Sequence, residues 1–309
     1  MKMKWRMALA LALAICMPAL YQGASAEEAH ADQVISHILG AKSAIIDNAE
    51  GAASDQFVFL AFWDFDDTIL KGDCAGGLRI DDKTVYRGLT ELAIESGYSQ
   101  IYDRDEGLAR FWKDYVVLEE NIGPWISYPF LPQMLRGSKA KDVSSLARNH
   151  FEDVLQNYFF KSSIKILNAL EKNGIQNHVI SASPDIFVDA AASPLGLPKE
   201  RFNGVEVKIE DGRLTEEIVY PVTWAKGKVE KLTSIVAAIK RQHPGKQVIV
   251  LAAFGNSYGS DGPFMKYVVT RRLPAGKPIG VMINGGAPLE SYQNIFLKVE
   301  QSEVLSSGQ

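Results

Sequence analysis

The chain has 309 residues, of which 47% are hydrophobic, and its 33 Lys and Arg against 37 Asp and Glu give a formal charge of −4 at pH 7. A mildly acidic chain has no broad electrostatic attraction for nucleic acid or anionic membranes, so neither partner is expected. This length and hydrophobic content allow an α/β domain with a sizeable insertion, stabilised by its own core.

The first 26 residues have the pattern of a secretory signal peptide. Lys2, Lys4 and Arg6 precede an apolar run, and Ala24-Ser25-Ala26 offers the small residues of a cleavage site. The run is too short for a permanent membrane span, which needs about 20 residues. We therefore predict cleavage near Ala26 and a periplasmic or secreted protein without a permanent membrane span. Of the two cysteines only Cys74 would remain, so no internal disulfide is expected.

Helices and strands then alternate along the chain, except in residues 73–160. A helical apolar period covers residues 31–48, and Phe57–Trp63 is an unbroken apolar run of seven, typical of a strand buried on both faces. Residues 73–160 are rich in aromatic residues and mostly helical, without a convincing buried strand. The later predicted elements are helices at 164–170, 185–192 and 227–241, strands at 178–180, 248–253 and 278–283, and a hairpin at 205–219.

This order of elements predicts an α/β fold with a doubly wound, mostly parallel sheet and an inserted helical cap. Residues 27–72 and 161–309 would form the core, and residues 73–160 would form the cap. Ligands bind at the carboxyl ends of the strands in such sheets. The unusual polar residues of this sequence follow the predicted strands at that end.

An acidic cluster, Asp64-Phe65-Asp66-Asp67-Thr68, directly follows the buried run. Side chains two residues apart lie on the same side of a strand, so Asp64 and Asp66 can converge, and their repulsion favours a bound cation. One carboxylate can act as a nucleophile while the other protonates a leaving alcohol and later deprotonates a water. Thr68 can bind a phosphate oxygen at the following turn. An acidic loop that caps a helix is the alternative, which the buried strand disfavours.

A buried strand followed by Asp-x-Asp-x-Thr resembles the first motif of the haloacid dehalogenase superfamily. The second motif, a strand ending in Ser or Thr, is matched at Ser181, and the third, a Lys near a helix start, at Lys228. Ser183 and Lys226 are rival choices two residues away. The fourth motif, a strand followed by acidic residues, is matched at 254–261. Four motifs in the family's order imply its Rossmannoid core, and the cap position is similar to that of the phosphoserine phosphatase-like branch.

The resemblance implies a role for each matched residue. Asp64 would attack the phosphate and form an aspartyl phosphate, and Asp66 would be its acid–base partner. Thr68, Ser181 and Lys228 would bind the transferring phosphoryl group and neutralise its charge.

Magnesium is the cofactor that the resemblance implies. Its expected ligands are Asp64, the backbone carbonyl of Asp66, and Asn256 or Asp261. Asn256 stands where the family commonly has an Asp, and an amide oxygen brings no charge, so we expect a lower metal affinity.

We therefore expect an exported Mg²⁺-dependent phosphatase that hydrolyses a small phosphomonoester. A phosphotransferase with the same chemistry is one alternative. A non-catalytic phosphate-ester binding protein is another, motivated by Asn256.

The export signal, the cap position and the Gly-Asn-Ser-x-x-Ser-Asp-Gly segment also look like those of secreted phosphorylcholine phosphatases. Aromatic rings of the cap, together with Glu119 and Glu120, could bind a quaternary ammonium group, but the helical spacing of Phe111, Trp112 and Tyr115 predicts that most of these rings pack inside the cap. Arg79, Lys83 and Arg87 could bind a carboxylate or second phosphate, or form a solvated face. The rings are those of Phe111, Trp112, Tyr115, Trp125, Tyr128 and Phe130.

Overall fold

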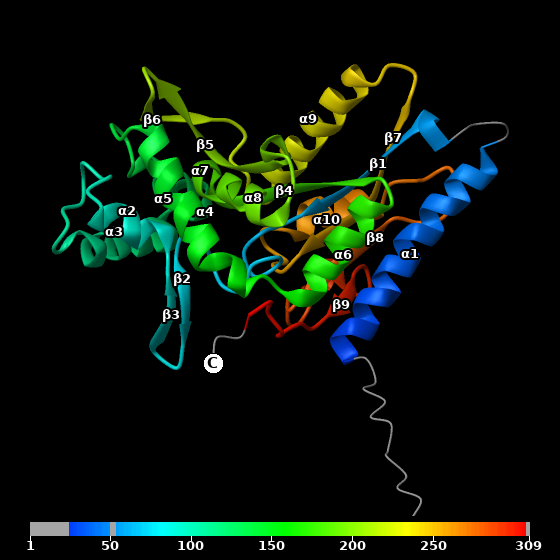
Figure 1. Ribbon diagram of the computed structural model, residues 1–309, viewed down its shortest axis with the longest axis horizontal. Helices are drawn as coiled ribbons and strands as arrows, with labels where there is room; N and C mark the ends of the chain where they lie inside the picture. The colour runs from blue at the N-terminus through cyan, green and yellow to red at the C-terminus, as the bar shows by residue number, and fades with distance from the viewer. Residues whose placement is uncertain (1–24, 50–53, 307–309) are drawn as a thin grey trace, which may run out of the picture.

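The computed structural model describes residues 25–49 and 54–306 (Figure 1). All but the last two residues of the predicted leader lie outside the described residues. The first helix, α1, covers Ala26–Asn48, and the Ser25 side chain caps it by accepting a hydrogen bond from the Glu28 amide at 3.2 Å. None of the helices in the described ranges is both long and apolar enough to cross a membrane.

Seven strands form one sheet in the order β6-β5-β4-β1-β7-β8-β9. All neighbours are parallel except β5 and β6, which are antiparallel. The predicted fold class, a mostly parallel doubly wound α/β sheet, is thereby confirmed. The strands are β1 (Phe57–Trp63), β4 (Ile175–Pro184), β5 (Phe202–Glu210), β6 (Arg213–Val219), β7 (Gln247–Gly255), β8 (Ile279–Ile283) and β9 (Leu297–Val299).

The central strand β1 is apolar throughout because both of its faces are covered by helices. Phe57, Phe59 and Trp63 pack in the core with α1 and with α6 (Lys161–Lys172). The alternate residues, among them Leu60 and Phe62, pack in a second core under α9 (Lys226–Gln242) and α10 (Gly262–Val269). Every side chain of the strand is buried, so the carboxyl end of β1 is held rigidly where Asp64 begins.

Several later elements differ from their predicted extents. Strand β4 is ten residues long and extends beyond the predicted residues 178–180 at both ends. Asn177, near its start, is buried and accepts a hydrogen bond from the Trp63 indole at 2.7 Å. The predicted helix at 185–192 is broken into α7 (Asp185–Val188), a 3₁₀ turn and α8 (Ala192–Leu195). Helix α10 and strand β9 were not predicted.

Residues 73–160, the cap segment, hold a hairpin as well as helices. The hairpin escapes sequence reasoning because its strands are largely exposed and carry no apolar run. Asp81 and Asp82 have φ of 47° and 62°, as a two-residue hairpin turn requires. The elements are β2 (Gly77–Ile80), β3 (Lys83–Arg87), α2 (Leu89–Glu95), α3 (Gly107–Asn121), α4 (Pro124–Gln133) and α5 (Ala140–Asp153).

Two of the basic residues considered as anion ligands bind within this segment instead. Arg79 donates to the Asp82 carbonyl at 2.9 Å, and Arg87 pairs with Glu91 at 2.7 Å. Lys83 is exposed at the start of β3. Arg79 and Arg87 therefore stabilise the hairpin turn and the start of α2.

The cap segment is also attached to the outer edge of the sheet. The link between α4 and α5 pairs with β6: the Gly137 amide donates to the Leu214 carbonyl at 2.8 Å, and the Leu214 amide donates to the Ser138 carbonyl at 2.9 Å. The Ala140 amide donates to the Gly212 carbonyl at 2.9 Å. Figure 1 shows α4 and α5 beside this β5–β6 hairpin.

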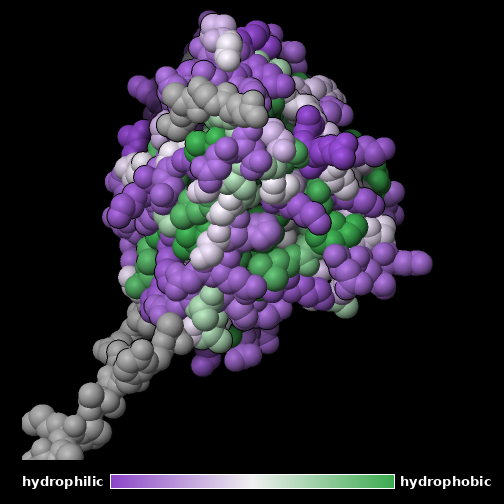
Figure 2. All heavy atoms as spheres, turned by 90° about the vertical axis from the view of Figure 1, so that its right-hand side faces the viewer, coloured by the Kyte–Doolittle hydropathy of each residue, from purple (hydrophilic) through white to green (hydrophobic). Residues whose placement is uncertain are grey.

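The opposite side of the molecule carries the N-terminal ends of β1 and β7 and is the face in Figure 2, where apolar patches lie between polar side chains. A groove of about 360 Å³ is formed by α9, the first residues of β7 and the segment after α10. The polar residues predicted to bind phosphate lie at the carboxyl ends of the strands instead. The groove is therefore remote from the candidate site.

Candidate active site

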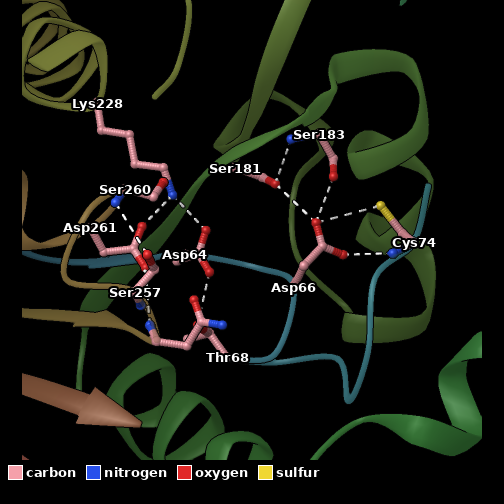
Figure 3. Close-up of polar contacts among 11 residues, drawn as sticks. Asp64, Asp66, Thr68, Cys74, Ser181, Ser183, Lys228, Ser257, Ser260 and Asp261 are labelled. Atoms are coloured by element: carbon pink, nitrogen blue, oxygen red, sulfur yellow. Dashed lines mark hydrogen bonds and ion pairs between the residues drawn. The ribbon is translucent and has the colours of Figure 1, made fainter. Parts of the chain in front are cut away.

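Asp64 lies immediately after β1 and is fixed through its backbone and its side chain. Its amide donates to the Phe254 carbonyl on β7 at 2.9 Å, and the preceding Trp63 ring stacks on the Phe254 ring with centroids 3.6 Å apart. The residue is 6% exposed, and its carboxylate accepts hydrogen bonds from the Thr68 hydroxyl at 2.9 Å and from the Lys228 ammonium at 2.5 Å (Figure 3). Asp64 therefore presents a preorganised carboxylate at the carboxyl end of the central strand β1.

Lys228 lies in the first turn of α9 and is fully buried between two carboxylates. Its ammonium group contacts Asp64 at 2.5 Å and Asp261 at 2.6 Å. Burial lowers the pKa of Lys228, but Asp261 and Asp64 outweigh it, and the net pKa is raised. Lys226, the rival candidate, is exposed. The structure thus places Lys228 in the site as a permanent cation, and leaves Lys226 outside.

Asp261 supports this ammonium group from the loop after β7. One carboxylate oxygen contacts Lys228, and the other accepts hydrogen bonds from the amides of Asn256 at 3.0 Å and Ser257 at 2.9 Å. Ser257 in turn accepts a hydrogen bond from the Ser260 amide at 3.2 Å. The loop is therefore folded around the Asp261 carboxylate, which is 0% exposed.

The charge balance around Asp64 favours an additional cation. Burial, followed by the nearby Asp261, raises the pKa of Asp64 to about 6, against the opposing effects of Lys228 and Thr68. Asp64 and Asp261 thus share one ammonium group, and Asp66 adds a third acidic group to the site. Carboxylate, carbonyl and amide oxygens are the ligands that Mg²⁺ prefers, so the donors present fit that ion.

Asp66 is held by both serines at the end of β4. Its Oδ2 accepts hydrogen bonds from Ser183 at 2.6 Å and Ser181 at 3.3 Å, and its Oδ1 accepts from the Cys74 amide at 2.7 Å. Figure 3 shows the two hydroxyls converging on this carboxylate. Burial, followed by the neighbouring Asp73, raises the pKa of Asp66 well above its ordinary value. A carboxyl group whose pKa is raised keeps its proton to a higher pH and can then give it to a leaving alkoxide.

Asp73 is an acidic neighbour that sequence reasoning missed. The ligand atoms of Asp66, Asp73 and Cys74 lie within 4.8 Å of one another. Asp73 Oδ1 also accepts hydrogen bonds from the amides of Ala75 and Gly76, both at 2.7 Å, so it shapes the turn that opens the cap segment. The sequence could have indicated Asp73 as a site residue, because it is an acid seven residues after Asp66 at the start of the insertion.

The Cys74 thiol belongs to the same neighbourhood. Its sulfur donates to Asp66 Oδ2 at 3.8 Å, and burial raises the pKa of the thiol well above its ordinary value. The protonated thiol is therefore a weak donor to Asp66, and the hard oxygen ligands remain the candidates for a divalent cation.

The aromatic rings of the cap segment mostly pack against one another. Phe111 is fully buried, stacks on Phe130 with centroids 5.7 Å apart and meets Trp112 edge to face at 5.0 Å. Trp125 contacts Trp224 of the core edge to face at 4.9 Å. Glu119 accepts a hydrogen bond from Ser127. These contacts use the rings to build the cap and its contact with the core.

Solved structures with the same fold include proteins of low sequence identity. A protein of unknown function from Bordetella pertussis Tohama I has a TM-score of 0.59 at 14% identity, over 79% of this chain and 98% of that one. A conserved protein of unknown function from Anaerococcus prevotii DSM 20548 has a TM-score of 0.55 at 12% identity, over 89% and 94%. Cytosolic 5'-nucleotidase IIIB bound to cytidine has a TM-score of 0.53 at 15% identity, over 89% and 85%.

A search of curated proteins found none similar to this chain. The family described as haloacid dehalogenase-like hydrolase matches residues 61–266, a span that begins within β1 and includes every residue discussed above as a candidate for catalysis, phosphate binding or metal binding. The chain belongs to the haloacid dehalogenase-like hydrolase family.

Proposed function

We propose that the protein is an exported phosphatase that hydrolyses a small phosphomonoester through an aspartyl phosphate on Asp64. The observation that carries the proposal is the division of labour between two adjacent carboxyl groups. Asp64 is held by a buried ammonium group and a hydroxyl, whereas Asp66 is held by neutral donors beside another acid. Burial raises the pKa of both groups, but only at Asp64 does an ammonium group oppose the shift. Asp64 therefore ionises more readily, as a nucleophile requires, and Asp66 keeps its proton more readily, as an acid requires.

The reaction follows from these contacts. Asp64 attacks the phosphorus atom while Lys228 and Thr68 keep its carboxylate in place and compensate the charge that develops. Asp66 gives its proton to the leaving alkoxide and, as a carboxylate, then takes a proton from the water that attacks the aspartyl phosphate. Release of phosphate restores Asp64. Ser181 and Ser183 orient Asp66 throughout.

Magnesium would be held by the Asp64 carboxylate, the Asp66 backbone carbonyl and the Asn256 amide oxygen. Asp261 remains the other candidate, but each of its oxygens already accepts a hydrogen bond from Lys228 or from the loop amides. The bound ion would supply positive charge toward the phosphate oxygens and relieve the repulsion among the buried carboxylates.

The alternatives are a phosphotransferase and a non-catalytic ester-binding protein. The intact pairing of Asp64 with Lys228 and of Asp66 with two serines favours catalysis over binding alone. Export is proposed from the leader pattern. It predicts that N-terminal sequencing of the protein from a periplasmic or secreted fraction begins at Glu27.

The deciding experiment uses the purified chain with p-nitrophenyl phosphate, phosphoserine, phosphorylcholine and a nucleoside monophosphate, with Mg²⁺ or a chelator. A nucleotide is included because one solved structure of the same fold is a 5'-nucleotidase. We expect Asp64→Asn to lower kcat by at least about 10³-fold, because it removes the nucleophile. Lys228→Met should lower kcat by about 10²-fold or more, because it removes the charge that compensates the transition state.

Lys226→Met is the matched control, because it removes an exposed lysine two residues from the buried one; its kcat should stay within about twofold of the parent. Substantial activity in Asp64→Asn would contradict the nucleophile assignment. Ester binding without turnover on any substrate would favour the binding protein. Formation of a new phosphate ester when an alcohol is added would favour the phosphotransferase.

A further inference from the structure

The segment that follows β9, residues 300–306, reaches the turn that carries the catalytic carboxylates. Gln301 is only 5% exposed, and its amide nitrogen donates to the Thr68 carbonyl at 3.0 Å. Its amide oxygen accepts a hydrogen bond from Ser162. Ser163, next along α6, donates to the same Thr68 carbonyl at 2.6 Å. A side chain more than 200 residues away in sequence thus contacts the first motif directly.

The orientation of the Gln301 amide is determined by its neighbours. The Thr68 carbonyl can only accept, so the amide nitrogen has to face it, and a reversed amide would place two acceptors together. The opposite side then offers its oxygen to Ser162, whose hydroxyl can donate. The Thr68 carbonyl therefore decides which way the Gln301 amide faces.

Thr68 connects this amide to the nucleophile. Its carbonyl is held by Gln301 and Ser163, while its hydroxyl donates to Asp64 Oδ2 at 2.9 Å. The Thr68 amide donates to the Phe65 carbonyl at 3.2 Å, which closes the turn. Because the residue is held at its amide, carbonyl and hydroxyl, loss of the Gln301 bond leaves the carbonyl to Ser163 alone and loosens the hydroxyl that orients Asp64.

The backbone of Gln301 is itself anchored on both sides. Its amide donates to the Asn284 side chain at 2.8 Å, and the Asn284 amide group donates to the Gln301 carbonyl at 2.8 Å. On the next residue, the Ser302 amide donates to Glu27 of α1 at 2.8 Å. The Lys161 amide at the start of α6 donates to the Glu303 carbonyl at 2.9 Å. The segment is therefore a fixed support rather than a loose end.

We propose that Gln301 is a positioning residue for the reaction, acting through Thr68 on the orientation of Asp64. The inference rests on the proposed function for its effect on turnover. Gln301 lies beyond residue 266, where the match to the family ends, so this support comes from a part of the chain that the family match does not include.

The test is a double-mutant cycle between Gln301→Met and Thr68→Val. Methionine has a similar shape but no amide, and valine removes the Thr68 hydroxyl while keeping its carbonyl. In the parent, Gln301→Met should lower kcat about tenfold, as expected for about 1.4 kcal/mol, with KM within about twofold. In the Thr68→Val background the same change should lower kcat by less than about twofold. An equal loss in both backgrounds would overturn the proposal.

Glu27→Gln is the control for a general loosening of the segment, because Glu27 holds Ser302 but does not touch Thr68. Its kcat should stay within about twofold of the parent, and a tenfold loss would overturn a specific role of Gln301. If Gln301→Met does not fold, Gln301→Glu replaces it in the cycle, since it keeps an acceptor for Ser162, and the same outcomes decide.

Hydrogen exchange separates this proposal from the proposed function. Gln301→Met should speed exchange of the Thr68 and Ile69 amides about tenfold, and Glu27→Gln should leave them unchanged. If the parent hydrolyses no ester but these amides respond in this way, the function is wrong and the support of the turn by Gln301 stands. If the amides do not respond, the positioning proposal is overturned whatever the activity.

Discussion

Lys228 shows at the scale of one residue why the site is built from paired charges. A fully buried ammonium group is costly to desolvate, and the two carboxylates that contact it offset this cost. Removing one partner of a buried pair typically costs about 3–5 kcal/mol, because the other charge stays behind. Substitutions at Asp64 or Asp261 should therefore be checked for stability before a loss of activity is interpreted.

His178 gives the protein a specific sensitivity to acid. It lies in β4, is 6% exposed, and neither ring nitrogen has a hydrogen-bond partner among the described residues. Burial, followed by Arg201, lowers the pKa of His178 to about 4. At His178 the folded state then binds fewer protons than the unfolded state between that value and about 6.5, so the contribution of His178 to the free energy of unfolding is largest above pH 6.5 and falls as the pH decreases toward 4.

The corresponding prediction concerns His178→Phe, which keeps an aromatic ring beside Phe62. Between pH 6.5 and 4 the free energy of unfolding of the variant should fall by on the order of 3 kcal/mol less than that of the parent. Urea unfolding at several pH values measures this difference. His30→Gln is the control, because His30 is exposed. If His178→Phe shows the same pH slope as the parent, the acid sensitivity comes from other groups.

Whether the sequence could identify a site residue depended on whether two candidates, two positions apart, point in the same direction. Residues two apart on a strand share a side, so Ser181 and Ser183 could not be distinguished, and both contact Asp66. Residues two apart on a helix point about 200° apart, so only one of Lys226 and Lys228 could face the site. The sequence did not reveal which face of α9 is turned toward the site, and so could not decide between the two lysines.

At the scale of elements, the cap segment is held by backbone hydrogen bonds to β6. Arg136 and Glu216 also pair across this contact, but both are exposed, and such pairs contribute about 0–1 kcal/mol. The reciprocal bonds of Gly137 and Leu214 are the more specific attachment. The antiparallel β5–β6 hairpin thus offers its free edge to the cap.

Leu214→Pro tests this attachment, with Leu214→Ala as the matched variant. Both lose the buried leucine side chain, and proline alone lacks the amide that donates to Ser138. We expect the Gly137 amide to exchange about tenfold faster in Leu214→Pro than in Leu214→Ala, measured by hydrogen exchange. Equal exchange in the two variants would mean that side-chain packing holds the cap.

The elements that could be predicted are those with long apolar patterns. β1 was predicted at its observed bounds because seven consecutive buried residues precede the acidic cluster. The β2–β3 hairpin was missed because its residues are largely exposed, and β9 because it has only three residues. Short strands are defined by their partners in the sheet, and these partners are far away in sequence.

At the scale of the whole molecule, the buried negative charge couples metal binding to stability. The folded state brings Asp64 and Asp261 onto one ammonium group, with Asp66 close by in the chain, and an ion that binds only this state stabilises it. Magnesium at a hundredfold excess over its Kd should contribute about 2.7 kcal/mol. We expect Tm to rise by about 5–8 °C, measured by thermal unfolding with Mg²⁺ and with chelator.

Two variants define the origin of this shift. Asp64→Asn should lose most of it, and Asn256→Asp should reach the same shift at a lower Mg²⁺ concentration, because a carboxylate replaces a neutral amide. An unchanged Mg²⁺ titration in Asn256→Asp would show that residue 256 is not a ligand. A parent Tm that does not respond to Mg²⁺ would contradict the proposed metal site.

The overall arrangement limits what a sequence can reveal about such a site. Asp64, Asp66 and Thr68 lie within five residues, so their proximity follows from the local pattern. Gln301 reaches Thr68 across 233 positions, and neither its residue type nor its surroundings mark it as part of the site. Contacts of this kind become visible only when β8, β9 and α6 are placed together in space.

The position of Cys74 also allows opening of the site to be measured. The described residues include one cysteine, Cys74. It is 0% exposed and lies against Asp66 at the start of the cap segment. A thiol reagent can reach it only when the surroundings of Asp66 open. Its labelling rate therefore reports how often the closed site becomes accessible, without the introduction of a further cysteine.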